Sequence, residues 1–186
     1  MRIVGGEFRG RSLAAPKSND IRPTIDRTRE SLFNILAHAH PDALDGTRIL
    51  DLFAGTGAVG LEAMSRGCRA AMFVENSVEG RGLLWENIES LGLHGRAKIL
   101  RRDATQLGPV AKMEPFHLMF ADPPYGKGLG EKAFMAAHQG GWLVPGALAI
   151  LEERSDVLVQ VASPFELLED RVFGDTKMYF YAYRPA

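Results

Sequence analysis

The segment Asp51-Leu52-Phe53-Ala54-Gly55-Thr56-Gly57-Ala58-Val59-Gly60 decides the fold class. It joins the apolar run 49–53, which is typical of a buried strand, to a predicted helix over 58–66. Its G-x-G-x-x-G pattern lets the main chain turn tightly and lets a ligand approach the helix N-terminus. Glu75 follows twenty residues after Gly55, at the end of the next apolar run, where its carboxylate can accept both hydroxyls of a ribose. The pattern predicts a nucleoside site and leaves NAD and S-adenosylmethionine open as the ligand.

Strand and helix patterns alternate from residue 48 to the C-terminus. A second helix begins at a predicted capping box, with Asn76 as N-cap and Glu79 three residues later, and a third covers 131–138. The predicted strands cover residues 49–53, 70–74, 97–100, 116–121, 147–151, 165–172 and 177–183. The last two flank Gly174-Asp175, which is a hairpin signal. The fold class is therefore α/β: a doubly wound, mostly parallel, seven-stranded Rossmann-like sheet that ends in an antiparallel hairpin.

The first forty residues have a different pattern. Residues 1–13 are typical of a short β-hairpin, and after a loop a helix is expected beyond Pro23, with Thr24 as its N-cap. We therefore predict a small N-terminal extension of hairpin, loop and helix over 1–40 and a main domain over 41–186, which together form one compact unit.

The charge distribution indicates a polyanionic partner. Residues 1–30 carry seven basic and four acidic side chains, although the whole chain has a net charge of −1. A basic arm on an acidic body is typical of a protein that contacts phosphate with one end, and a solvated basic surface stays open as the alternative.

Composition excludes several protein classes. With 46% hydrophobic and 24% charged residues, the 186-residue chain is globular rather than disordered. It has no run of eighteen apolar residues, no apolar leader and a single cysteine, Cys68, so we expect a cytoplasmic protein without membrane span or intrachain disulfide. The five histidines lack partners at metal-ligand spacing, so no metal site is predicted.

The tetrapeptide Asp122-Pro123-Pro124-Tyr125 predicts the chemistry. It follows the apolar run 116–121, so it is expected at the carboxyl end of a strand, beside the crevice where α/β sheets bind ligands. The prolines fix φ and donate no N–H, so the loop presents acceptors: the Asp122 carboxylate and main-chain carbonyls. Two fixed acceptors can hold the hydrogens of an exocyclic amine and aim the nitrogen lone pair at an electrophile. Tyr125 offers a flat face for a base drawn out of its stack.

Asp103 is a further candidate for nucleoside binding. It follows the predicted strand 97–100, where a side chain can reach the amino group of an adenine. An aspartate that only caps a loop or helix is the equally open alternative.

Together these motifs resemble class I S-adenosylmethionine-dependent methyltransferases of amino nitrogens, and nearly the whole chain resembles the RsmD family. The resemblance rests on the glycine motif, the DPPY tetrapeptide, Phe73-Val74-Glu75 and Gly174-Asp175-Thr176. Its most specific part is N-terminal and consists of Met1-Arg2-Ile3-Val4-Gly5-Gly6, Arg9-Gly10-Arg11, Arg22-Pro23-Thr24, Asp26-Arg27, Arg29-Glu30 and Leu32-Phe33-Asn34-Ile35-Leu36. The family methylates N2 of a guanine in 16S ribosomal RNA, so the resemblance implies this activity, with S-adenosylmethionine as methyl donor.

The resemblance also implies site residues and partners. Cofactor binding would fall to Asp51, Ala54, Gly55, Gly57, Glu75, Asn76, Asp103 and Ala104. The catalytic positions would be Asp122, Pro123, Pro124 and Tyr125. RNA would be contacted by Arg9, Arg11, Arg22, Arg27, Arg29 and Lys127. The implied partner is 16S rRNA in the small ribosomal subunit or an assembly intermediate, with ribosomal proteins nearby, and a monomer is expected.

Three other functions stay open. An adenine-N6 methyltransferase acting on DNA or RNA would use the same tetrapeptide. A nicotinamide-dependent oxidoreductase would use the glycine motif but gives no reason for consecutive prolines. A non-catalytic RNA-binding assembly factor would keep the fold, although intact Glu75, Asp103 and Asp122 argue against lost activity.

Overall fold

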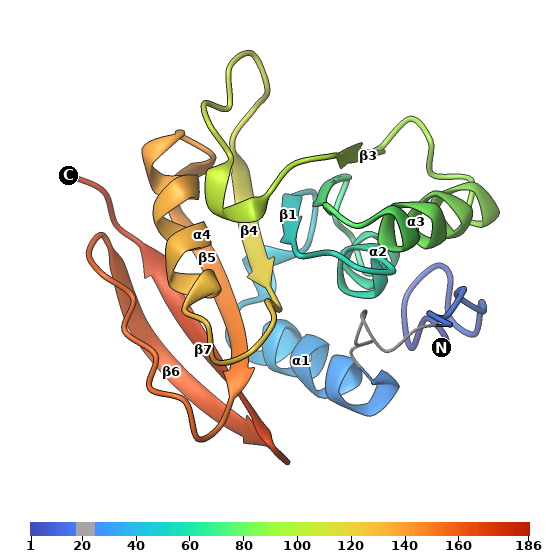
Figure 1. Cartoon of the computed structure of the whole chain (residues 1–186). Coiled ribbons are helices and arrows are strands. Elements are labelled where there is room, and N and C mark those ends of the chain that lie inside the picture. Colours follow the sequence, from blue (N-terminus) through green and yellow to red (C-terminus); the bar gives the residue numbers. More distant parts are fainter. Residues whose placement is uncertain (18–24) are drawn as a thin grey trace.

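A seven-stranded mixed sheet forms the centre of the molecule, with strand order β3-β2-β1-β4-β5-β7-β6 (Figure 1). The computed structural model describes residues 1–17 and 25–186. The strands are β1 (Arg48–Leu52), β2 (Ala70–Val74), β3 (Ala97–Leu100), β4 (Phe116–Ala121), β5 (Leu143–Arg154), β6 (Phe165–Phe173) and β7 (Thr176–Tyr183). The first five pair in parallel, whereas β7 pairs antiparallel with both β5 and β6. The predicted α/β fold with a C-terminal antiparallel hairpin is confirmed.

Helices cover both faces of the sheet. Their bounds are α1 (Asp26–Ala39), α2 (Ala58–Ser65), α3 (Val78–Ser90) and α4 (Leu129–Gln139), with short 3-10 turns η1 (Pro41–Ala43) and η2 (Ala104–Gln106). Residues of α1, α2 and α3 share one hydrophobic cluster with the sheet, whereas α4 and η2 contribute to the cluster on the other face. None of the helices in the described part of the chain has the length and apolar character that a membrane span requires.

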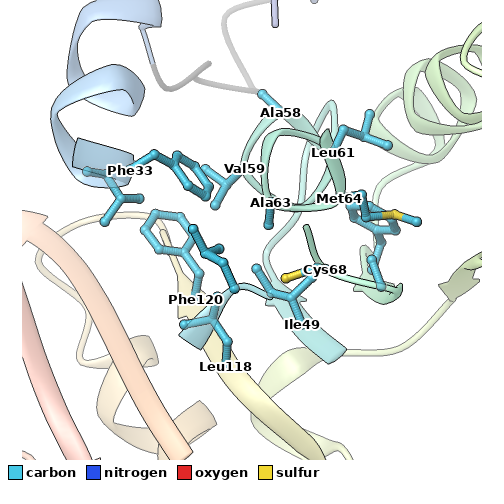
Figure 2. Close-up of a cluster of buried hydrophobic side chains, with 14 of the residues drawn as sticks. Phe33, Ile49, Ala58, Val59, Leu61, Ala63, Met64, Cys68, Leu118 and Phe120 are labelled. Carbon is cyan, nitrogen blue, oxygen red and sulfur yellow. The ribbon is translucent and has the colours of Figure 1, made fainter. Parts of the chain in front are cut away.

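Close packing of α1 and α2 on the sheet explains the first cluster. Figure 2 shows Phe33 of α1 beside Val59 of α2, above Phe120 and Leu118 of β4. Small side chains on α2, such as Ala63, let this helix approach the strands closely. Because parallel strands are buried on both faces, they have nearly continuous apolar sequences, which is why their positions were predictable.

Strand and helix ends differ from the predictions where side-chain contacts decide them. The N-cap of α3 is Ser77, whose Oγ accepts the Gly80 N–H at 2.9 Å, so the predicted Asn76 capping box is wrong by one residue. The residue at the N-cap position of α1 is Ile25, without a side-chain cap; the predicted cap Thr24 lies outside the described residues. In the sheet, β5 begins at Leu143, four residues before the predicted strand 147–151.

The short hairpin predicted over 1–13 is present in minimal form. Arg2 and Ser12 form one antiparallel bridge, and main-chain hydrogen bonds run from Ile3 N–H to the Arg11 carbonyl at 2.9 Å and from Leu13 N–H to the Met1 carbonyl at 2.8 Å. This hairpin packs on the C-terminal end of α2. Gly6 has a φ of +82°, and a Cβ there would lie 2.0 Å from the Ser65 carbonyl oxygen. The Ser65 hydroxyl also donates to the Gly5 carbonyl at 2.6 Å and accepts the Phe8 N–H at 2.9 Å. Contacts with α2 therefore add to the main-chain hydrogen bonds across the hairpin in fixing this loop.

A buried ion pair joins this loop to two helices. Arg29 and Glu62 are both 0% exposed, and Arg29 Nε donates to Glu62 Oε1 at 3.1 Å. The Glu62 carboxylate also accepts the N–H groups of Val4 and Gly5, each at 2.9 Å. Arg66 Nε donates to Glu62 Oε2 at 2.8 Å. The prediction that Arg29 contacts RNA is wrong, because its guanidinium is neutralised inside the protein.

Replacing Glu62 by Ala removes the acceptor of these four hydrogen bonds and one of the carboxylates that neutralise Arg29. We expect the free energy of unfolding in urea to fall by about 3–5 kcal/mol, because breaking a buried pair leaves an uncompensated charge. Arg69→Ala is the control, since the Arg69–Glu114 pair is 52% and 68% exposed. It should cost less than about 1 kcal/mol. Equal losses in the two variants would contradict a stabilising role for the buried pair.

Candidate active site

A cavity of about 690 Å³ opens at the carboxyl ends of the parallel strands. This volume is in the range of small-molecule and cofactor sites. The cavity lies where β1 is flanked by β2 on one side and β4 on the other, the switch point at which doubly wound sheets bind ligands. Its lining includes the predicted residues Asp51, Ala54, Gly55, Glu75, Asn76, Asp103, Ala104, Asp122, Pro123 and Pro124. Segments far apart in the sequence therefore meet at one site.

Three residues of the glycine loop between β1 and α2 have left-handed backbone conformations. Phe53, Gly55 and Gly57 have φ values of 54°, 57° and 80°, and the Gly57 N–H donates to the Ala54 carbonyl at 2.8 Å. A Cβ on Gly57 would lie 2.3 Å from Leu84 Cδ1, so only glycine fits between the loop and α3. Gly57 is buried and is not among the described lining residues of the cavity. Its role in the structure is to let the loop pack closely against Leu84 of α3.

Glu75 connects this loop to the start of α3. Its Oε1 accepts the Gly55 N–H at 2.7 Å, and its Oε2 accepts the Ser77 N–H at 2.8 Å. Each carboxylate oxygen keeps a second lone pair. The side chain can therefore hold the glycine loop in place and still accept hydroxyl groups from a ligand in the cavity.

Asp51 is a buried carboxyl at the floor of the cavity. It is 2% exposed, and its Oδ2 accepts the Gly60 N–H at 3.0 Å. Burial raises the pKa of Asp51 well above its usual value, and the hydrogen bond from Gly60 opposes this shift. The negative charges of Asp122 and Glu75 raise the pKa further. A cation in the cavity would relieve this repulsion.

Asp103 caps η2, as one of its two interpretations predicted, and it also lines the cavity, where its carboxyl group is open to a ligand. Its Oδ1 accepts the N–H of Thr105 at 2.9 Å and the Thr105 hydroxyl at 2.7 Å. The cap fixes the carboxyl group at the mouth of the cavity, next to Ala104.

The predicted tetrapeptide follows β4 directly. Asp122, Pro123 and Pro124 line the cavity, and Pro123 is buried. Tyr125 is half-buried and Lys127 is exposed. Neither residue belongs to the described cavity lining. Immediately after the tetrapeptide, the Gly126 N–H donates to Glu153 Oε1 at 3.0 Å. The structure thus brings Asp122 and both prolines, but not Tyr125, to the described cavity wall.

The cavity lining also contains residues that were not predicted as site residues: Phe53, Thr56, Ala58, Val59, Val74, Ser77, Glu79, Arg102, Phe120 and Leu129. Ser77 and Glu79 arrive there because α3 begins at the cavity rim. Arg102 directly precedes Asp103, and its Nη1 donates to the Leu107 carbonyl. The only sequence signal for Ser77, Glu79 and Arg102 was that they lie within three residues of the predicted positions Asn76 and Asp103.

The basic residues of the N-terminal arm are spread over the surface. Arg9, Arg11 and Arg27 are exposed, and Arg22 lies outside the described residues. Arg11 Nη2 donates to the Ser90 carbonyl at 2.7 Å, at the last residue of α3. The first turn of α3 borders the cavity, so Arg11 lies one helix length away, about 20 Å for thirteen residues. Arg11 and the cavity therefore lie at opposite ends of α3.

Comparisons with known proteins agree with this architecture. The family model "Conserved hypothetical protein 95" matches residues 1–182. Ribosomal RNA small subunit methyltransferase D of Escherichia coli K12 is 37% identical over 182 residues, which cover 97% of this chain and 89% of that protein. The enzyme of the same name from Haemophilus influenzae is 30% identical, with 94% and 89% covered.

Solved structures give the same result. The Escherichia coli protein yhhF superposes with a TM-score of 0.83 at 34% identity, covering 99% of this chain and 98% of that chain. The fold is also that of the Thermus thermophilus 16S rRNA N2 G1207 methyltransferase, solved with AdoMet and guanosine, at a TM-score of 0.67 and 20% identity, covering 91% of this chain and 45% of that one. The chain therefore belongs to the family described as Conserved hypothetical protein 95, the RsmD family, and is a methyltransferase.

Proposed function

We propose that the protein transfers a methyl group from S-adenosylmethionine to the exocyclic N2 amine of a guanine in 16S ribosomal RNA. One observation carries the proposal: the acceptor loop Asp122-Pro123-Pro124 forms the wall of the same cavity that holds Asp51, Gly55 and Glu75. A nucleoside-binding loop and an amine-binding loop thus face a common space. The names of the relatives, which are ribosomal RNA small subunit methyltransferases, support the choice of substrate.

The cavity residues fit S-adenosylmethionine. This ligand carries a sulfonium and an ammonium cation, and the cavity contains the carboxyl groups of Asp51, Glu75, Glu79, Asp103 and Asp122 against the single cation Arg102 among its described lining residues. Glu75 would accept the ribose hydroxyls, and Asp103 with Ala104 would meet the adenine. Asp51, Ala54 and Gly55 would surround the methionine end, beside Asn76 at the rim. When bound, the sulfonium supplies an electrophilic methyl group.

The acceptor loop would orient the target amine. The Asp122 carboxylate and the Pro123 carbonyl would each accept one amine hydrogen, which directs the nitrogen lone pair away from the loop and into the cavity. The reaction needs no strong base, because the methylated amine can lose its proton to solvent after transfer. Tyr125 would stack on the extruded base once RNA is bound.

The RNA would contact basic residues around this site. Arg27 at the start of α1 and Lys127 after the tetrapeptide are the exposed cations proposed for phosphates near the base, with Arg22 as a further candidate. Arg9 and Arg11 would contact phosphates farther along the RNA. We propose that the protein acts as a monomer on the small ribosomal subunit or an assembly intermediate, where ribosomal proteins lie close to the target.

Nucleoside analysis tests this proposal. Small-subunit particles that lack the modification are incubated with labelled S-adenosylmethionine, and the labelled nucleoside is identified by mass spectrometry. We expect N2-methylguanosine; N6-methyladenosine would support an adenine-N6 methyltransferase instead. Asp122→Ala should abolish transfer, because the amine loses an acceptor, and the protein should still bind the cofactor through Asp51, Glu75 and Asp103. Full transfer by this variant would contradict the role of the loop.

The raised pKa of Asp51 predicts pH-dependent cofactor binding. A cationic ligand favours ionised Asp51, so binding releases a proton, and affinity increases as pH rises through the pKa of the ligand-free site. Calorimetric titrations with S-adenosylmethionine at a series of pH values measure this dependence. Asp51→Asn should bind more weakly and with a flatter pH profile. Superimposable profiles for the two proteins would rule out the linkage.

Neutralising Arg9 and Arg11 by Gln tests the arm. Binding to the RNA particle should weaken, and the slope of log affinity against log salt should flatten by about 1 for each phosphate that the arm no longer neutralises. Affinity for S-adenosylmethionine should not change. The matched control is Arg171→Gln with Arg184→Gln, two exposed cations near the β6 edge of the sheet. If both double variants bind the particle equally well, the arm is only structural.

A further inference from the structure

The segment that contains the acceptor loop, residues 122–126, is held to β5 at both of its ends. At its start, Ala121 of β4 stands in register with Leu151 of β5. At its end, the Gly126 N–H donates to the side chain of Glu153, two residues farther along the same strand. In Figure 1 the loop after β4 runs past the carboxyl end of β5 before α4 begins. β5 therefore contacts the loop that carries Asp122 at both of its ends.

Burial and main-chain hydrogen bonds fix the orientation of the Glu153 side chain. It is 1% exposed, and its Oε1 accepts a second main-chain hydrogen bond, from the Arg154 N–H at 2.8 Å. A buried carboxylate is stable only when hydrogen bonds replace its hydration, so these two donors fix the position of its oxygen. The neighbouring helix is fixed to the same strand, because a Cβ on Gly130 of α4 would lie 2.4 Å from Leu151 Cδ1.

The composition of the loop explains why such an anchor is useful. Pro123 and Pro124 have no N–H, so neither can donate a hydrogen bond to the rest of the protein. Proline fixes φ, but the position of the loop relative to the sheet depends on contacts outside the prolines. Gly126 provides one: it turns the chain with a φ of +76° and donates its N–H to Glu153.

We infer that Glu153 is a positioning residue for amine methylation, which holds the acceptors Asp122 and Pro123 at the distance that transfer requires. The inference rests on the proposed function. Glu153 acts through Gly126 and not on the substrate, since the described cavity lining does not include it. Small displacements of reacting groups reduce rates steeply, and a shift of about 1 Å can cost about 100-fold.

Kinetics of Glu153→Ala and Glu153→Gln test the inference. Glu153→Ala should lower kcat by about 10- to 100-fold. The Kd for S-adenosylmethionine and the KM for the RNA particle should stay within about twofold, because the groups that bind them are unchanged. Glu153→Gln should recover most of kcat, because its amide oxygen can still accept the Gly126 N–H.

Trp142→Phe is the matched control for loss of a buried hydrogen bond. Trp142 is fully buried on the same face of the sheet, and its Nε1–H donates to the Gly108 carbonyl at 2.7 Å, near the amino ends of the strands. It should lower stability and leave kcat of the folded enzyme unchanged. A kcat for Glu153→Ala equal to that of Trp142→Phe, each corrected for the folded fraction, would overturn the inference.

Hydrogen exchange gives a readout that does not require activity. In Glu153→Ala the Gly126 amide should exchange faster than in the unsubstituted protein, whereas Trp142→Phe should not affect it. Unchanged exchange at Gly126 would overturn the anchoring role. Absence of methylation by the unsubstituted protein, with faster exchange in the variant, would instead refute the proposed function alone.

Discussion

Parallel hydrogen bonding between β1 and β4 is the constraint on which the site depends. The register pairs Asp51 with Phe120 and Leu52 with Ala121, although these residues are about seventy positions apart. Because the strands run in the same direction, the loops that follow them leave the sheet at one edge. The chain then continues into α2 on one face and into α4 on the other, and a crevice remains between the diverging loops.

The carboxyl groups that line this crevice favour a cationic ligand. Asp51, Glu75 and Asp122 come from three different strand ends. Burial is the main cause of the raised pKa of Asp51, and the negative charges of Asp122 and Glu75 raise this pKa further. The ligand-free cavity therefore holds more negative charge than its surroundings stabilise well. Hydrogen bonds from Gly60, Gly55 and Ser77 relieve part of this cost. A cationic ligand relieves more, which is the physical argument for a sulfonium cofactor over an uncharged or anionic one.

Buried or half-buried carboxylates that accept main-chain N–H groups recur at the irregular segments. Glu62 on α2 accepts from the N-terminal loop, Glu75 from the glycine loop, and Glu153 on β5 from the loop after β4. Each of these segments has donors that no strand or helix pairs. A carboxylate on a rigid element satisfies them and fixes the loop at the same time, because a charged acceptor makes a stronger hydrogen bond than a neutral one.

The sequence by itself determined the sheet, its closing hairpin and half of the described cavity lining, because apolar runs and glycine or proline motifs depend on local chain geometry. It could not show that Arg29 is buried, since a guanidinium near the N-terminus is expected to be a surface charge until its partner, thirty-three residues away, is located. The roles of Gly57 in packing and Glu153 in anchoring also needed the tertiary structure. In each case the deciding contact joins segments whose proximity follows from the fold rather than from local sequence.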